Sequence, residues 1–254
     1  MEKDSILITG CGDGGIGSSL AHVFQQRGYH VFATNREPNK MASLKDLPNV
    51  TLLALDVTNK SHIQDAVEAV SSQTSGKLFR LVNNAARNHF MPLLDDDIDA
   101  AEAIFETNVW GPLAVTQAFA PLFIEAQGTL ATELFQRWAC QTEMFHTAII
   151  VDLKKIPSGT YGASKIAQEQ IADVFRLELM PFKFKGLMVV IGAIQTNGQT
   201  YLGDWKLPAN SRYKSAEEKI KTVVQATDGM PQTPREEYAN QVVDHILGGP
   251  TGKV

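Results

Sequence analysis

The sequence has few of the residues and patterns that build disulfide-rich, zinc-bound or membrane-spanning proteins. Its two cysteines, Cys11 and Cys140, stand in no CxxC or Cys/His pattern, and its six histidines show no metal-ligand spacing. A disulfide framework and a metal site are therefore excluded. No apolar run approaches the roughly 18 residues of a membrane span, and the N-terminus lacks the charged and apolar regions of a signal peptide. We expect a cytoplasmic chain with no integral membrane segment and no metal.

An excess of positive charge is also absent. The chain carries 23 Lys and Arg against 28 Asp and Glu, a net charge of −5, and no basic cluster stands out. Nucleic-acid binding draws on clustered basic residues, so we expect no nucleic-acid partner. Repeats, low-complexity tracts and linkers are missing as well. The sequence therefore predicts a single domain over residues 1–254, large enough to bury a substantial core.

What the sequence does contain is an alternation of apolar strands and amphipathic helices. The predicted strands cover residues 5–9, 29–34, 50–57, 78–85, 147–153 and 186–192. The predicted helices cover residues 16–27, a stretch from about 61, and residues 99–126 and 160–179. Near-continuous apolar strands that alternate with such helices indicate a parallel sheet buried on both faces. The predicted fold class is α/β, a doubly wound parallel sheet of the Rossmann type with helices on both faces.

Residues 198–235 differ in character from the rest of the chain. They are rich in Gly, Pro, Asn and Lys and show little periodicity. They follow the carboxyl end of a predicted strand, where open α/β sheets bind ligands. We interpret them as a segment that covers the substrate. An incidental surface excursion explains the composition equally well.

A glycine-rich turn links the first predicted strand to the first helix, with the sequence TGCGDGGIG over residues 9–17. Glycines at such a turn let the backbone bend tightly and approach a pyrophosphate, while the amides at the helix N-terminus face the anion. The position between strand and helix predicts dinucleotide binding. A glycine-rich loop without a ligand is the alternative.

The residues that end the second predicted strand bear on the choice of cofactor. A carboxylate there holds the ribose 2′-hydroxyl of NAD, whereas an arginine pairs with the 2′-phosphate of NADP. Asn35 is neutral and Arg36 is cationic, which favours NADPH over NAD. Glu37 is the competing feature, because it falls about twenty residues after the last glycine, where the ribose carboxylate is expected. Arg36 as a solvated surface residue is the other alternative.

Tyr161 and Lys165 form the third chemical feature, in the motif YGASK. Residues i and i+4 share one face of a helix, so the phenol and the ammonium point into the same cleft. A nearby cation favours the phenolate and lowers the tyrosine pKa from about 10 toward neutrality, which suits a general acid or base. Two unrelated residues on a helix surface would have the same spacing.

Taken in order, five motifs resemble the short-chain dehydrogenase/reductase family over nearly the whole chain. They are TG(x)4GIG at 9–17, LDVT at 55–58, LVNNAA at 81–86, ETNVWG at 106–111 and YGASK at 161–165. The stretches VFAT, LLALDVT and FETNVWG are also similar to the fungal branch that includes NADPH-dependent acyl-dihydroxyacetone-phosphate reductases. The resemblance implies an NADP(H)-dependent oxidoreductase that converts the carbonyl of a small molecule to an alcohol by hydride transfer.

The family's site residues can be carried over where this sequence matches. The resemblance implies that Tyr161 is the general acid, that Lys165 lowers its pKa and holds the nicotinamide ribose, and that Asn108 positions a water in the proton relay. It assigns cofactor contacts to Gly10, Gly15, Ile16, Gly17, Arg36, Asp56, Val57, Asn83, Asn84, Tyr161, Lys165, Ile194 and Thr196. It also implies a homodimer or homotetramer built on the long helices.

The serine that polarises the substrate carbonyl in this family has no counterpart here. Counting back thirteen residues from Tyr161 reaches Ala148, inside the predicted strand 147–153, and that strand ends near Asp152. Three hydroxyls are candidate replacements: Thr147, Ser158 and Thr160. A carboxylate such as Asp152 would accept rather than donate hydrogen bonds and would not stabilise an oxyanion unless protonated. A non-redox enzyme of the same fold, such as a cyclase or isomerase, or an NADP(H)-binding protein is therefore the alternative function.

Two further departures concern the course of the chain. Residues 128–146 look like an atypical insertion before the predicted strand 147–153, and the sequence leaves the path of residues 128–160 open. The chain ends at Val254, where members of the family continue into a last strand, so we expect that this strand is truncated.

Overall fold

The structure is a computed structural model that describes residues 4–135, 159–183, 185–197, 202–248 and 252–253. Its centre is one parallel sheet of seven strands in the order β3-β2-β1-β4-β5-β6-β7. The strands are β1 (Ser5–Ile8), β2 (His30–Asn35), β3 (Val50–Ala54), β4 (Arg80–Asn83), β5 (Thr129–Phe135), β6 (Lys185–Ile191) and β7 (Gly252–Lys253). The strand order reverses between β1 and β4, which is the arrangement of a doubly wound sheet.

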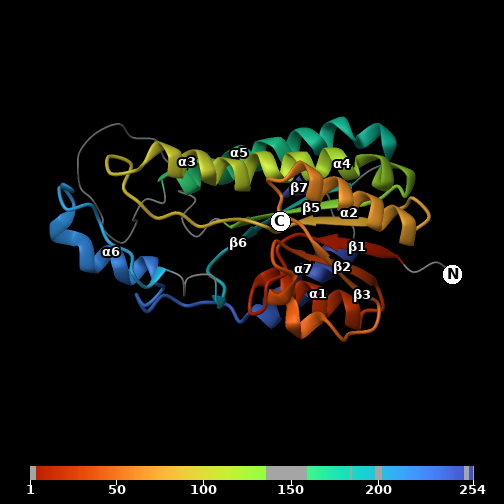
Figure 1. The fold of residues 1–254 in the computed structure, drawn as a ribbon, viewed down its shortest axis with the longest axis horizontal. Coiled ribbons are helices and arrows are strands. Elements are labelled where there is room, and N and C mark those ends of the chain that lie inside the picture. The colour runs from red at the N-terminus through yellow and green to blue at the C-terminus, as the bar shows by residue number, and fades with distance from the viewer. Residues whose placement is uncertain (1–3, 136–158, 184, 198–201, 249–251, 254) are drawn as a thin grey trace.

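Helices cover both faces of this sheet (Figure 1). The α-helices are α1 (Ile16–Gln26), α2 (Lys60–Gln73), α3 (Ile98–Phe105), α4 (Gly111–Glu125), α5 (Gly159–Glu178), α6 (Glu217–Val224) and α7 (Arg235–Gly248). Short 3-10 turns occur at Pro38–Leu44, Met180–Phe182 and Lys214–Ala216, and a π-turn at Glu106–Trp110 joins α3 to α4. Helices α1 and α7 pack together on one face, and α2, α4 and α5 lie on the other. The predicted doubly wound α/β fold is confirmed.

The first strand shows why its sequence is apolar throughout. Successive side chains of a strand point to opposite faces, and both faces of this sheet are covered. Ile6 and Ile8 join the core beneath α1 and α7, whereas Leu7 joins the core beneath α2 and α4. All three side chains are fully buried. Burial on both faces therefore fixes β1 at the centre of the molecule, with its carboxyl end leading into the glycine turn.

The fifth strand differs from the sequence expectation. Residues 129–135, which the sequence placed in an insertion, form β5 and pair in parallel with both β4 and β6. The stretch predicted as this strand, residues 147–153, lies outside the described residues. The sequence TLATELF carries polar residues, and one of them, Thr132, is 3% exposed within the sheet. Strand pairing on both sides, rather than an apolar pattern, selects this segment.

A seventh strand follows α7. Gly252 and Lys253 pair with Leu187 and Met188 of β6 as the two-residue strand β7, which the sequence pattern did not predict. The helix before it, α7, buries Tyr238, Val242 and other apolar residues against the core on the α1 side. Two residues are too few for sequence periodicity to reveal a strand. The expected truncation stays a prediction.

Residues 202–235 form a small lobe at one end of the molecule, where α6 lies apart from the sheet (Figure 1). The lobe has its own apolar core, which includes Leu207, Ile220 and Val224 together with Phe90 from the segment after β4. Trp205 Nε1 donates a hydrogen bond to the Phe90 carbonyl at 2.6 Å. The described part of the predicted covering segment, residues 202–235, is therefore joined to the segment that follows β4. Within the described part of the chain, no helix is long and apolar enough to cross a membrane.

Candidate active site

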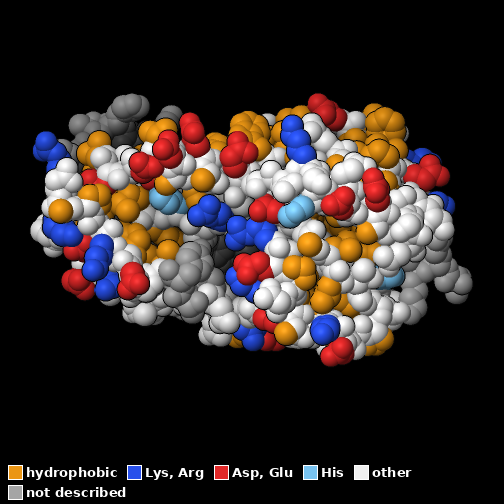
Figure 2. Space-filling model, in the orientation of Figure 1, with side chains coloured by type: hydrophobic (Ala, Val, Ile, Leu, Met, Phe, Trp, Pro, Cys, Tyr) orange, Lys and Arg blue, Asp and Glu red, His pale blue; other side chains and the backbone are white. Residues whose placement is uncertain are grey.

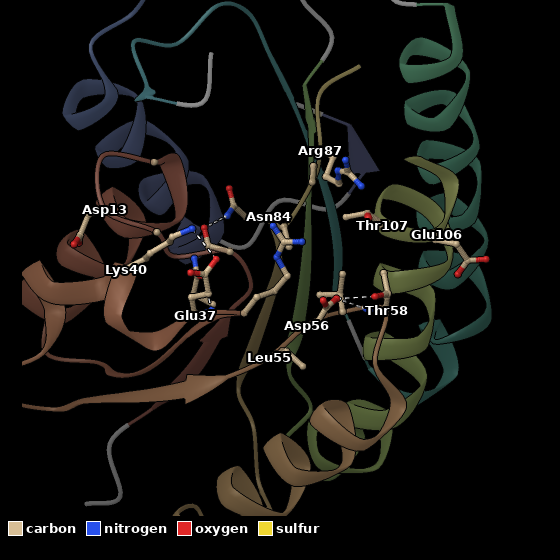
Figure 3. A pocket seen from close by; sticks show the side chains of 18 of the residues that line it. Asp13, Glu37, Lys40, Leu55, Asp56, Thr58, Asn84, Arg87, Glu106 and Thr107 are labelled. Carbon is tan, nitrogen blue, oxygen red and sulfur yellow. Dashed lines mark hydrogen bonds and ion pairs between the residues drawn. The ribbon is translucent and has the colours of Figure 1, made fainter. Parts of the chain in front are cut away.

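A cavity of about 670 Å³ opens at the carboxyl edge of the sheet, around the point where the strand order reverses. Its walls come from the segments that follow β1, β2, β3 and β4, together with residues of α3 and the π-turn (Figure 3). Figure 2 shows basic side chains gathered beside the hollowed middle of this face. Open α/β sheets bind nucleotides in this crevice. Of the predicted cofactor residues, Gly10, Gly15, Arg36, Asp56, Val57 and Asn84 line it.

The glycine turn is packed too tightly for side chains. Gly10 has a φ of +77°, and a Cβ built there would lie 2.9 Å from the Ala85 Cα. Asn84 fastens the turn from the next strand, because its Nδ2 donates to the carbonyls of Thr9 at 2.6 Å and Gly10 at 3.0 Å. Gly15 is the N-cap of α1 and supplies no side-chain cap. The first amides of the helix are therefore available to an anion such as a pyrophosphate.

Gly17 offers a direct test of this packing. A Cβ at Gly17 would lie 2.5 Å from both the Gly10 carbonyl oxygen and Asn84 Nδ2. We expect Gly17→Ala to displace the turn at an overpacking cost of about 1–3 kcal/mol. The NADPH affinity, measured by calorimetric titration, should fall about tenfold. Gly192→Ala is the matched control, because nothing lies within 4 Å of a Cβ there. An unchanged affinity in Gly17→Ala would show that the turn does not carry the ligand.

The residues after β2 form the wall beside the predicted ribose site. Arg36 and Glu37 both line the cavity. The Glu37 carboxylate is held by Lys40, with Oε1 and Nζ 2.6 Å apart (Figure 3). Asn35 Oδ1 accepts a hydrogen bond from the Glu37 amide at 3.0 Å. Glu37 thus already has a cationic partner, although the sequence count placed it at the ribose carboxylate position.

Asp56 follows β3 on the opposite wall of the cavity. Its Oδ1 accepts hydrogen bonds from the Thr58 amide at 2.9 Å and the Thr58 hydroxyl at 2.7 Å. Burial alone would raise the pKa of Asp56. The hydrogen bonds from Thr58, the charge of Arg36 and the interaction with His62 together outweigh it and hold this pKa below the usual value. Asp56 is therefore a carboxylate at neutral pH, ready to accept hydrogen bonds at the cavity wall.

Helix α5 brings Tyr161 and Lys165 together as their spacing predicts. Both side chains are buried, with 4% of Tyr161 and 2% of Lys165 exposed. Lys165 Nζ lies 5.8 Å from the centroid of the Tyr161 ring. The Phe90 ring stacks on the other side of the site, with its centroid 6.4 Å from that of Tyr161. A buried phenol with an ammonium nearby is the kind of pair that general acid catalysis uses.

Asn108 lies in the π-turn and ties this pair to the sheet. Its Oδ1 accepts from the Arg87 amide at 2.8 Å, and its Nδ2 donates to the Arg87 carbonyl at 3.0 Å. Nδ2 also donates to Ser164 Oγ at 3.1 Å, between Tyr161 and Lys165 on α5. The side-chain amide therefore fastens the segment after β4 to α5. Both N–H groups of this amide are engaged by protein groups, and the implied role in positioning a water remains a prediction.

Comparison with known proteins identifies the family. A family model described as short chain dehydrogenase matches residues 4–131. Short-chain dehydrogenase PC-15 of Penicillium crustosum is 40% identical over 97% of this chain and 86% of that protein. This chain belongs to the short-chain dehydrogenase/reductase family. The predicted resemblance is confirmed, and the chain has the fold of this oxidoreductase family.

Two further relatives of the short-chain dehydrogenase are informative. The NADPH-dependent 1-acyldihydroxyacetone phosphate reductase of Schizosaccharomyces pombe is 30% identical over 84% of this chain and 69% of that protein. A short chain dehydrogenase from Burkholderia cenocepacia, solved in complex with NADP, matches with a TM-score of 0.74 at 23% identity. That match covers 100% of this chain and 87% of the other. The likeness at this low identity concerns the fold alone.

Several of the predicted site residues are not among those that line the described cavity. Asn83 is buried, and its Nδ2 donates to Thr116 Oγ1 of α4 at 2.9 Å. Ile194 is buried and forms an isolated bridge with Thr233. The predicted cofactor residues outside the lining are Ile16, Gly17, Asn83, Tyr161, Lys165, Ile194 and Thr196. The predicted catalytic residue Asn108 is also outside it. Asn197, which the sequence reading did not select, does line it.

Of the candidate replacements for the family's serine, Thr160 alone lies within the described residues. Thr160 Oγ1 donates to the carboxylate of Asp96, whose other oxygen lies 2.5 Å from His89 Nε2. The hydroxyl hydrogen of Thr160 is therefore directed at the Asp96 carboxylate and is not available to the carbonyl of a substrate. The other candidates, Thr147, Asp152 and Ser158, lie outside the described residues. Sequence reasoning missed the partner of Thr160, because Asp96 is sixty-four positions away along the chain.

Proposed function

We propose that this short-chain dehydrogenase is an NADPH-dependent carbonyl reductase that converts a ketone or aldehyde of a small hydrophobic molecule to an alcohol. The observation that carries the proposal is the buried pair of Tyr161 and Lys165 on α5, fixed by Asn108 beside the cavity. When bound, the reduced nicotinamide supplies the hydride. The remaining task, protonation of the substrate oxygen, then falls to this chain.

The residues around the cavity fit such a cofactor. In the glycine turn a Cβ at Gly10 or Gly17 would clash with neighbouring protein atoms, and the N-terminus of α1, which has no side-chain cap, adjoins the cavity at Gly15. Asp56, ionised at neutral pH, can accept a hydrogen bond from the amino group of an adenine. The protein thus offers a cradle for the phosphates and an acceptor for the base.

The proton is assigned to Tyr161. In this proposal its Oη donates to the carbonyl oxygen as the alkoxide develops. The Lys165 ammonium stabilises the phenolate that is left, because opposite charges attract strongly in a buried site. The engaged amide of Asn108 keeps α5 at a fixed distance from the segment after β4, so the phenol stays oriented.

NADPH is the proposed cofactor, with NAD less favoured. Glu37 already pairs with Lys40 at 2.6 Å, so no unpaired carboxylate from the end of β2 awaits a ribose. Arg36 lines the same wall and can form a charge-assisted bond to a 2′-phosphate. The name of the S. pombe relative points the same way.

The lobe of residues 202–235 is proposed to cover the substrate. Phe90 belongs to the core of the lobe and also stacks on the Tyr161 ring. An apolar lobe whose core includes a residue stacked on the proposed catalytic tyrosine suits a hydrophobic substrate. Exposed apolar residues on α5, such as Ile166 and Leu177, support a homodimer or homotetramer. We place the enzyme in the cytoplasm, where reducing conditions suit a chain with two cysteines.

The proposal is tested by following NADPH oxidation, by loss of reduced-nicotinamide absorbance, over a panel of ketones and aldehydes. We expect turnover of at least one hydrophobic carbonyl compound and a lower rate with NADH. Binding of NADPH without turnover of any compound would indicate a binding protein or a non-redox enzyme and would overturn the reductase.

A further inference from the structure

Beneath the Tyr161–Lys165 pair lies a buried amide, Gln168, that the proposed reaction does not use. Gln168 is 3% exposed on α5, and its Oε1 accepts a hydrogen bond from Lys165 Nζ at 3.0 Å. Lysine has donors only, so this contact fixes which end of the amide is oxygen. The Nε2 of Gln168 must then point the other way.

That nitrogen, Gln168 Nε2, is one of two buried polar atoms beside the same small cavity that lack a hydrogen-bond partner within the described residues. The other is Asn83 Oδ1. Both residues line the same small cavity of about 10 Å³ between the sheet and helices α4 and α5. The first atom is a donor and the second an acceptor. A polar cavity of roughly this volume holds one water molecule, which can accept from one and donate to the other.

We propose that Gln168 is a positioning residue for Lys165, and that one internal water shared with Asn83 holds Gln168 in turn. The proposal rests on the function proposed above, in which Lys165 supports Tyr161. It extends the support of Lys165 from α5 through the water to Asn83 at the carboxyl end of β4.

The neutrality of Gln168 is the reason that it suits this task. A buried ammonium is costly unless hydrogen-bonded, and the amide oxygen satisfies one of its three donors. An amide carries no net charge, so the ammonium keeps its full attraction for the Tyr161 phenolate. A carboxylate at the same position would pair with Lys165 and weaken that attraction. Gln168 therefore fixes where the charge lies without reducing it.

Two substitutions of nearly equal volume test the inference. Gln168→Met removes the acceptor, and Gln168→Glu replaces it with a charged one. We expect each to lower kcat/KM for carbonyl reduction about tenfold. Gln168→Met loses the hydrogen bond to the Lys165 ammonium, and Gln168→Glu places a negative charge beside it. Asn83→Ala should lower kcat/KM about threefold through loss of the shared water. Unchanged kinetics in Asn83→Ala would overturn the part of the proposal that concerns the water.

The titration of Tyr161 gives a second measurement that needs no substrate. Tyrosinate absorbance is recorded against pH, and the difference between each protein and its Tyr161→Phe counterpart isolates Tyr161 from the other tyrosines. The ionisable residues His89, Asp96 and Arg87, in the segment after β4, are the same in every variant, so a change of the midpoint between variants reports the substitution at Gln168. We expect Gln168→Glu to move the Tyr161 midpoint to higher pH, because compensated positive charge stabilises the phenolate less.

Ile171→Val is the matched control, since it removes one methyl group from the wall of the same cavity and no polar atom. It should leave both the midpoint and the rate unchanged. If both Gln168 variants fold and retain the wild-type midpoint and rate, the inference is overturned. If the wild-type protein reduces no carbonyl while the midpoint still moves, the proposed function fails and the positioning of Lys165 stands.

Discussion

Replacement of Tyr161 by phenylalanine is expected to lower kcat for carbonyl reduction roughly 10³-fold, the range in which general acid catalysis contributes. The substitution removes one oxygen and keeps the ring that stacks against Phe90. The loss therefore reports the proton rather than the packing. Steady-state rates of NADPH oxidation on the best carbonyl compound measure it, and calorimetric titration should show NADPH affinity changed only a few-fold.

Tyr29→Phe is the control for this substitution. Tyr29 lies between α1 and β2, where its ring packs edge to face on Phe24 and carries the Arg80 guanidinium 5.1 Å above it. Loss of its hydroxyl should leave the rate unchanged. A Tyr161→Phe protein that reduces the substrate at the full rate would show that another group supplies the proton. The acid would then have to be sought elsewhere, and the His89–Asp96 pair would be the next to test.

The fold could be predicted from the sequence because its signals are local. The strand β1 is apolar at every position, since both of its faces are buried, and the glycine turn that follows marks its end. Helix α5 places Tyr161 and Lys165 on one face by its own geometry, whatever surrounds it. Each of these features depends on a few neighbouring residues, and each was recovered.

The fifth strand could not be predicted because its signal is not local. Thr132 is buried in a strand that packs between β4 and β6, where an apolar residue is the usual choice. The stretch 147–153 has the more strand-like composition. Strand pairing is a long-range property, and a sequence without partner information favours the more apolar candidate.

The two adjacent asparagines at the end of β4 show the same limit within the site. The family resemblance assigned both to the cofactor. Asn84 reaches the glycine turn, whereas Asn83 points to Thr116 on the opposite side. Successive side chains of a strand alternate in direction, so the geometry at the end of β4 does not let Asn83 and Asn84 face the same ligand. Gln168 was missed for a different reason, because a glutamine in a helix usually faces solvent.

Replacement of Arg36 by glutamate is expected to reverse the preference for the cofactor. A charge-assisted bond to the 2′-phosphate contributes about 1.5–3 kcal/mol, and a carboxylate in its place adds repulsion. At about 1.4 kcal/mol for each factor of ten, kcat/KM for NADPH should fall roughly 10²-fold. Activity with NADH should hold or rise, because the new carboxylate can accept the ribose hydroxyls. The ratio of kcat/KM for the two cofactors is the measurement.

Glu37→Gln tests whether Arg36 selects the cofactor or whether Glu37 holds the ribose, as its distance in sequence from the last glycine suggested. If Lys40 engages Glu37 as the 2.6 Å contact indicates, Glu37→Gln should not lower activity with NADH. The substitution releases Lys40, and the released ammonium should favour binding of the 2′-phosphate of NADPH. If Glu37 instead holds the ribose, Glu37→Gln should reduce activity with NADH, and Arg36→Glu should change little. The second pattern would transfer cofactor selection from Arg36 to Glu37. The two substitutions stand one residue apart on the same wall of the cavity, so their opposite predictions decide which side chain the ribose meets.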